Sequence, residues 1–149
     1  MEKNVTVVGR WYITLYGTNG EIKDYREGKN VITTNGLDFL ASYLGSAAAT
    51  ASTFTQKYVA IGTDATAEAV SNTALGAEAA RHTGTVSYVS NAIYRVTATF
   101  ASGLGTGAIV EYGLLSSSAD GTMFSRDTES VINKGADDVL TVITEVTLA

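Results

Sequence analysis

The sequence contains no cysteine and no proline, and it has a single histidine. Without cysteine the chain can form neither a disulfide nor a thiolate metal site, so packing alone must hold the core together. Charged residues make up 17% of the chain, below the roughly 25% that is usual for soluble domains, while Gly, Ala, Ser and Thr are abundant. This composition favours short strands and small-residue turns over long, solvated helices.

Positive charge is scarce as well. The chain has ten Lys and Arg against fifteen Asp and Glu, which gives a formal net charge of −5. The basic residues are scattered along the sequence, whereas surfaces that bind nucleic acids usually gather them on one face. We therefore expect no nucleic-acid partner.

Long apolar runs are also missing. No stretch of about 18 apolar residues is present, and residues 1–10 lack the basic start, apolar centre and cleavage site of a signal peptide. The sequence therefore predicts a soluble protein with no membrane partner that is made in the cytoplasm. Its 149 residues fit one domain, which at this size buries about 68–70% of the surface of the unfolded chain.

The sequence shows no combination of residues that is typical of a catalytic site. His82 would have to be the base of any Ser-His-Asp triad, but the G-x-S-x-G turn of such a nucleophile is missing. The glycine-rich residues 103–107 lack the G-x-G-x-x-G spacing, so we expect a flexible connection between strands. Asp137 and Asp138 are expected in a solvated turn. The sequence thus predicts a protein without enzymatic activity, cofactor or metal.

Two strands are predicted near the N-terminus. In residues 10–16, apolar side chains at positions 11, 13 and 15 alternate with the others, which is the period of a strand. Residues 18–20, Thr-Asn-Gly, are typical of a hairpin turn, so residues 21–26 should return antiparallel. Because this second strand is mostly charged, we expect it to lie at an edge of the sheet.

One short helix is predicted after this hairpin. Either Thr34 or Asn35 is suited to cap it, apolar residues recur at positions 37, 40, 41 and 44, and Gly45 should end it. This apolar stripe predicts that the helix covers an open end or face of a sheet. The small residues 46–55 that follow are expected to form a loop.

The hairpin of residues 106–126 is predicted to be the centre of the fold. Residues 109–115 are apolar on both faces, which is typical of a strand buried between layers. Ala-Asp-Gly at residues 119–121 supplies a tight turn, and residues 122–126 return as the partner strand.

Further strands are predicted at residues 58–61, 83–89, 92–101 and 139–148, and residues 62–74 form a long polar loop of a kind that is often functional. In total the chain has eight or nine short strands and one small helix. This pattern predicts an all-β fold, an antiparallel β-sandwich of jelly-roll type, over residues 10–149.

Residues 1–9 precede this domain as an N-terminal arm or an edge strand. The valines of this segment have high strand propensity, and Gly9 is expected to act as a hinge, so the arm could add a strand to a sheet edge elsewhere. We hypothesise that it contacts a neighbouring subunit or another protein. The candidate partner-binding residues are Glu2, Lys3, Asn4, Val5, Thr6, Val7 and Val8.

Four segments of the chain carry a family resemblance. They are GRWYITLYGTNGEIKDYREGKNVITTNGLDFLASYL, YVAIGTDATAEAVSNTALGAEAAR, TGAIVEYGLLSSSADGTMFSR and INKGADDVLTVITEV, in this order. Together they resemble a widespread group of small virion proteins of tailed bacteriophages, in which similar motifs recur in the same order. Ile143 stands near the position at which the group has a tryptophan.

The resemblance implies a non-enzymatic component of the virion. The leading hypothesis is a capsid decoration protein that binds the major capsid protein of the outer shell as a homo-oligomer, a trimer at points of local three-fold symmetry. Two alternatives stay open. One is a tail-fibre or baseplate adaptor domain, and the other is a carbohydrate-binding module that uses exposed tyrosines and the loop of residues 62–74.

Overall fold

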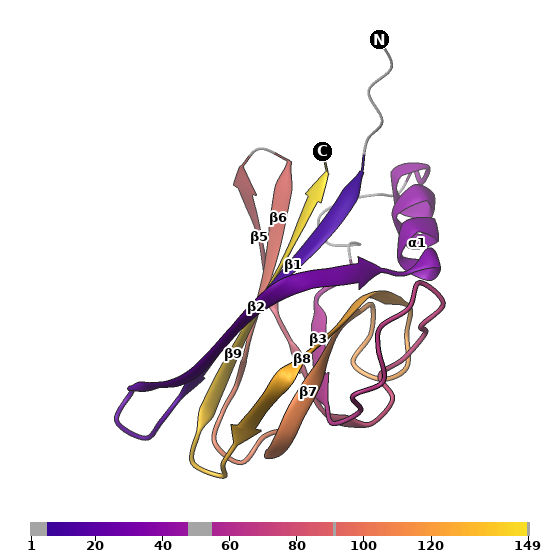
Figure 1. The fold of residues 1–149 in the computed structure, drawn as a ribbon. Coiled ribbons are helices and arrows are strands. Elements are labelled where there is room, and N and C mark those ends of the chain that lie inside the picture. Colours follow the sequence, from indigo (N-terminus) through magenta and orange to yellow (C-terminus); the bar gives the residue numbers. More distant parts are fainter. Residues whose placement is uncertain (1–5, 48–54, 91, 149) are drawn as a thin grey trace.

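A computed structural model describes residues 6–47, 55–90 and 92–148 of the chain, and Figure 1 shows its elements. In chain order the elements are β1 (Val7–Tyr16), β2 (Ile22–Ile32), α1 (Thr34–Leu44), β3 (Tyr58–Gly62), β4 (Glu78–Thr83), β5 (Thr85–Ser90), β6 (Ile93–Phe100), β7 (Gly107–Leu115), β8 (Met123–Lys134) and β9 (Val139–Leu148).

The strands of the described residues form one nine-stranded sheet in the order β4-β3-β7-β8-β2-β1-β9-β6-β5. Every neighbouring pair is antiparallel, which confirms the predicted all-β, antiparallel class. The sheet is strongly curled, so that β3 and β4 come back into contact with β6 (Figure 1). A jelly-roll arrangement of this curled sheet stays a prediction.

The hydrophobic core lies inside the curl. Alternate residues of the strands point inward, as the period of two requires, and Trp11 packs against Tyr112 with ring centroids 6.1 Å apart. The core includes Trp11, Ile13, Leu15, Val59, Ile61, Val96, Ala98, Phe100, Ile109, Tyr112, Leu114, Phe124, Ile132, Leu140, Val142 and Val146.

The predicted central hairpin is confirmed. β7 lies between β3 and β8, and its turn contains Asp120 and Gly121 with positive φ angles of 52° and 81°. Aspartate and glycine are the residue types that tolerate this backbone conformation. The returning strand is longer than predicted, because β8 continues past Arg126 to Lys134.

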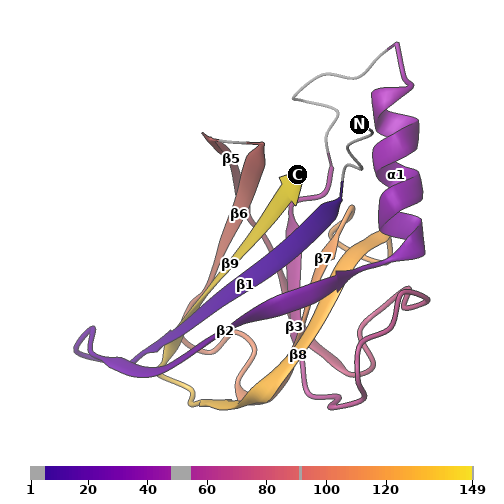
Figure 2. The ribbon, with the colours of Figure 1, turned by 45° about the horizontal axis from the view of Figure 1, so that its top comes forward.

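The prediction of an edge strand at residues 21–26 is wrong in part. β2 stands between β1 and β8 in the sheet, although it pairs with β8 only through Val31 and Ile32. Its charged first half has β1 as its one strand neighbour among the described residues, which explains the edge-like sequence. Figure 2 shows β2 crossing from the side of β1 to β8, so this strand joins the two halves of the curl.

The predicted hinge at Gly9 is also wrong. β1 begins at Val7 and runs through Gly9 without interruption, because Val7, Val8 and Gly9 pair with Leu148, Thr147 and Val146 of β9. The last residues of the proposed arm are therefore part of the sheet. Residues 1–5 lie outside the described residues.

The predicted helix is present as α1 and ends before Gly45, but Thr33 caps it instead of Thr34 or Asn35. The Thr33 Oγ1 atom accepts a hydrogen bond from the Gly36 amide at 2.9 Å. The apolar stripe covers the sheet only in part, because Leu40 packs against the core as predicted, whereas Leu37 is 47% exposed and Leu44 is 73% exposed. The helix is anchored by its contacts with β8 and by Phe39 and Leu40, which pack against the core.

Candidate binding surface

An apolar groove lies where β1 starts, β2 ends and α1 begins. It has a volume of about 470 Å³ and is lined by Thr6, Val7, Val8, Lys29, Asn30, Val31, Ile32, Leu37 and Val70. Three separate parts of the chain therefore meet at this surface: the start of β1, the β2-α1 junction and the loop between β3 and β4.

Hydrogen bonds fix the base of the helix beside the groove. Thr33 donates from Oγ1 to the Met123 carbonyl at 2.6 Å and from its amide to the Phe124 carbonyl at 3.0 Å. Gly36 packs so closely on β8 that a Cβ there would lie 2.4 Å from the Phe124 carbonyl oxygen. A glycine at this position is what lets α1 dock on β8.

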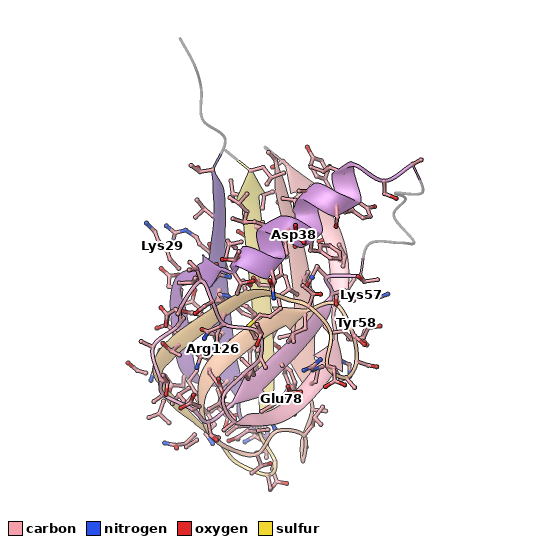
Figure 3. The ribbon with its side chains drawn as sticks, turned by 90° about the vertical axis from the view of Figure 1, so that its right-hand side faces the viewer. Lys29, Asp38, Lys57, Tyr58, Glu78 and Arg126 are labelled. Carbon is pink, nitrogen blue, oxygen red and sulfur yellow. The ribbon has the colours of Figure 1, made fainter. Side chains whose placement is uncertain are left out.

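The groove continues into exposed apolar side chains. Val8 is 38% exposed, Leu37 47% and Val70 59%, and the Thr34 amide donates to the Val70 carbonyl at 2.8 Å, which holds Val70 beside the helix. Lys29 supplies a positive charge at the rim, on the side of β2 (Figure 3). Apolar side chains that gather on a surface in this way are typical of a protein contact.

The structure brings part of the predicted partner-binding segment to this groove. Thr6, Val7 and Val8 line it, and Val7 also packs against the core. Glu2, Lys3, Asn4 and Val5 lie outside the described residues. Val70 lies in the predicted functional loop of residues 62–74 and Leu37 in the predicted apolar stripe, but their meeting with the start of β1 was not predicted, because the groove forms only when β2, α1 and the loop come together.

The predicted functional loop is held in place by a buried carboxylate. Glu111 of β7 is fully buried and accepts hydrogen bonds from the backbone amides of Asp64, Gly76 and Ala77 at 3.2, 2.9 and 2.8 Å. These three donors lie at the two ends of the loop that joins β3 to β4. Glu111 therefore closes this loop.

Arg126 of β8 neutralises Glu111. It is 2% exposed, and its Nε and Nη2 atoms lie 3.2 and 3.0 Å from the Glu111 Oε2 atom. Its Nη1 atom donates to the Asn72 side chain at 3.3 Å, so the same guanidinium also holds the middle of the loop. Figure 3 shows Arg126 on the side of the molecule along which this loop runs.

This ion pair was not predicted from the sequence, because Glu111 stands at the centre of residues 109–115, whose pattern is apolar on both faces. The available signal was one charged residue in each predicted strand of residues 106–126, because opposite charges on neighbouring strands are commonly paired.

The other residues considered from the sequence have structural surroundings. The ring of His82 lies 2.8 Å from the Thr83 carbonyl oxygen and edge-on to Phe100. Residues 103–107 connect β6 to β7, as predicted, with positive φ angles at three glycines.

The prediction of a solvated turn at residues 137–138 is only half right. Asp137 is exposed, but Asp138 is 5% exposed and lies 2.9 Å from the Lys23 ammonium. Hydrogen bonds from Lys23 and from the Gly135 amide lower the pKa of Asp138. The pair ties the start of β2 to the turn before β9.

Over residues 6–47, 55–90 and 92–148, no cluster of three or more His, Asp or Glu side chains is arranged to hold a metal ion. The helix in this part of the chain is not long and apolar enough to span a membrane.

Comparison of the chain with protein-family models, with curated proteins and with solved structures gives no match. The geometry described above is accordingly the basis on which a function can be proposed, together with the sequence motifs.

Proposed function

We propose that this protein is a non-enzymatic structural component of a tailed-bacteriophage virion, a decoration protein that binds the outer capsid shell as a homotrimer. The motifs quoted above support the proposal, because they span nearly the whole chain and keep the order found in that group of virion proteins. We also propose that the curled sheet is a β-sandwich of jelly-roll type, which is a common architecture among capsid proteins.

The observation that carries this proposal is the apolar groove beside α1. Val8, Leu37 and Val70 stay 38%, 47% and 59% exposed in the single chain, so covering them would contribute a part of the about 1.5–3 kcal/mol that full burial of such a side chain is worth. Contact with a flat or convex apolar surface would remove the exposed apolar side chains from water. In our proposal that surface belongs to the capsid shell.

The buried polar groups support a structural role in a second way. Glu111 and Arg126 are saturated by contacts with each other and with the loop between β3 and β4. A catalytic pair needs access to a substrate, whereas these two groups are 0% and 2% exposed. Their arrangement suits a rigid scaffold.

The proposal can be tested by mixing the purified protein with capsids that lack decoration. Saturating, stoichiometric binding to heads is the expected result. Binding only to tails would favour the adaptor alternative, and binding only to cell-surface glycans would favour the carbohydrate-binding module. Either of these two outcomes contradicts the proposal.

A single substitution connects this test to the groove. Leu37→Asp places a charge at a residue that is 47% exposed and lies in the first half of α1, where a negative charge is tolerated by the helix dipole. We expect at least a tenfold loss of capsid affinity with unchanged folding. Val131→Asp on β8 is the matched control, since Val131 is 41% exposed but does not line the groove.

A further inference from the structure

Two carboxyl groups meet beneath β2 at the place where this strand crosses to β8. A Cβ atom on Gly28 would stand 1.8 Å from the Glu129 Oε1 atom and 3.4 Å from the Asp127 Oδ2 atom. Both carboxyl groups therefore surround the same point, and Gly28 leaves the room that they occupy. A side chain at position 28 would displace them.

Asp127 is shut off from solvent at this point. It is 1% exposed, and its Oδ2 atom has no hydrogen-bond partner among the described residues. Its cross-strand neighbour Tyr112 is fully buried, and the Tyr112 hydroxyl likewise has no partner within the described part of the chain. The Thr128 amide hydrogen-bonds to the Asp127 carboxyl group, but a negative charge that no cation balances is strongly unfavourable in such surroundings.

The positively charged groups around Asp127 do not balance a negative charge on its carboxyl group. Arg26 approaches from β2, but its guanidinium is engaged by the Asp24 carboxylate and by the carbonyl oxygens of Tyr25 and Val131. In residues 6–47, 55–90 and 92–148 no Lys or Arg forms an ion pair with Asp127 or Glu129.

The other charged groups near Asp127 are either negative themselves or already bound to other residues. Glu68 reaches in from the loop between β3 and β4 and accepts a hydrogen bond from the Thr128 hydroxyl. Arg126, the neighbour of Asp127 along β8, is bound to Glu111 and the loop. The surroundings of Asp127 are therefore acidic as well as dry.

We propose that Asp127 and Glu129 share one proton beneath Gly28 and that this proton acts as a latch, which holds the end of β2 against β8. The strand pairing at this junction is short, since only Val31 and Ile32 pair with β8, and the hydrogen bonds of Thr33 to the Met123 and Phe124 carbonyls continue it. When the proton leaves to solvent, two carboxylates face each other under Gly28. Their repulsion and their demand for water drive the end of β2, and α1 with it, away from β8.

The electrostatics agree with this geometry. Burial, the charge of Glu129, a hydrogen bond with its carboxyl group and the charge of Glu68 raise the pKa of Asp127 to about 8. Because the pKa is raised in the closed state, protonation stabilises closure. This stabilisation is complete below the ordinary pKa of about 4, falls as the pH rises, and is lost once the pH exceeds about 8.

Opening of the latch would affect the apolar groove. Asn30, Val31 and Ile32 at the end of β2 line the apolar groove together with Leu37 of α1. Opening the β2-β8 junction would therefore change the shape of the groove. The pH dependence of the β2-β8 junction does not require any partner in the groove. A test of the latch can therefore fail while the proposed function holds, and the reverse.

Hydrogen exchange of the intact protein tests the latch. The protection factor, which corrects for the intrinsic dependence of exchange on pH, is measured for amides of residues 29–34 at several values between pH 5 and pH 9. We expect protection to fall by up to tenfold per pH unit between pH 5 and pH 8 and to level off above pH 8. Amides of the β1-β9 pair should keep their protection and serve as the internal reference.

Three variants assign the effect to the carboxyl pair. Asp127→Asn should remove the dependence of protection on pH, and Glu129→Gln should weaken it, because each variant loses one of the two carboxyl groups. Asp137→Asn removes one exposed carboxyl group outside the cluster and should keep the wild-type dependence. Using two latch variants keeps the test valid if one of them folds poorly.

Two results would overturn the proposal. The first is protection at residues 29–34 that does not change between pH 5 and pH 8. The second is a decrease that persists in both latch variants or that appears equally in the β1-β9 pair, because the proton would then act on the whole fold or at another site.

Discussion

At the scale of single residues, the fold depends on one buried ion pair. Glu111 receives three backbone amides and the Arg126 guanidinium, so a single carboxylate satisfies the two ends of a long loop. Buried charges are tolerated only when they are paired and hydrogen-bonded in this way. The polar loop could not pack on the apolar hairpin without them.

Glu111→Ala is expected to lower the free energy of unfolding by about 3–5 kcal/mol, because it leaves the buried Arg126 charge and three amides without their acceptor. Urea denaturation followed by tryptophan fluorescence of Trp11 measures the loss. Glu145→Ala is the matched control, since its partner Arg95 is 39% exposed and such pairs contribute about 0–1 kcal/mol. Equal losses in the two variants would contradict the special role of Glu111.

At the scale of elements, α1 is a helix whose apolar side chains are partly packed on the core and partly exposed. Thr33 and Gly36 hold its first turn on β8, whereas Leu37 and Leu44 stay exposed further along. The amphipathic pattern of the sequence is only partly used within the fold, because Phe39 and Leu40 pack against the core while Leu37 and Leu44 stay exposed. These exposed apolar side chains are the physical basis for expecting an external partner.

Gly36→Ala should destabilise the protein by about 1–3 kcal/mol, since the new methyl group would overlap the backbone of Phe124 and force the helix off β8. Chemical denaturation gives the magnitude. Gly45→Ala is the comparison, because Gly45 has a φ of −81° and a Cβ there would meet its nearest atom at 3.4 Å. We expect a change within about 0.5 kcal/mol for this variant. A similar loss at both positions would argue against close docking of α1 on β8.

At the scale of the whole molecule, β2 joins the two halves of the curled sheet. It pairs with β1 along most of its length and with β8 only at its end, after which the chain enters α1. The start of β1 and the end of β9 lie side by side at the same end of the molecule (Figure 2). The groove and the start of the first strand therefore lie at one end of the molecule, and Gly28 pairs with Trp11 further along β1.

Two truncations distinguish the role of the first strand from the role of the segment that precedes it. Deleting residues 1–5 spares every described strand pair, so the unfolding temperature should stay unchanged, while capsid binding should weaken if the proposed arm is correct. Deleting residues 1–8 also removes Val7, which packs on the core, and should cost about 1.5–3 kcal/mol. Thermal unfolding and capsid binding are measured on both. Unchanged binding after the shorter deletion would contradict a role for residues 1–5.

The sequence by itself determined the local structure of this protein. The alternation in residues 10–16 predicted β1, Asp120 and Gly121 predicted the central turn, and Gly45 predicted the end of the helix. These predictions succeed because each depends on a few neighbouring residues: the period of side chains along a strand, the backbone freedom of glycine and the spacing of a helix. Taken together, the predicted strands and turns indicate the antiparallel, all-β class.

Only the tertiary structure decided how these elements meet. Periodicity indicates which face of a strand is buried but not which strand lies beside it, so the place of β2 between β1 and β8 could not be predicted. The same limit applies to Glu111 with the loop amides, to Asp127 with Glu129 under Gly28, and to the groove. Each of these sites joins residues that are distant in the sequence. Their burial, and with it their chemistry, arises only when the sheet curls.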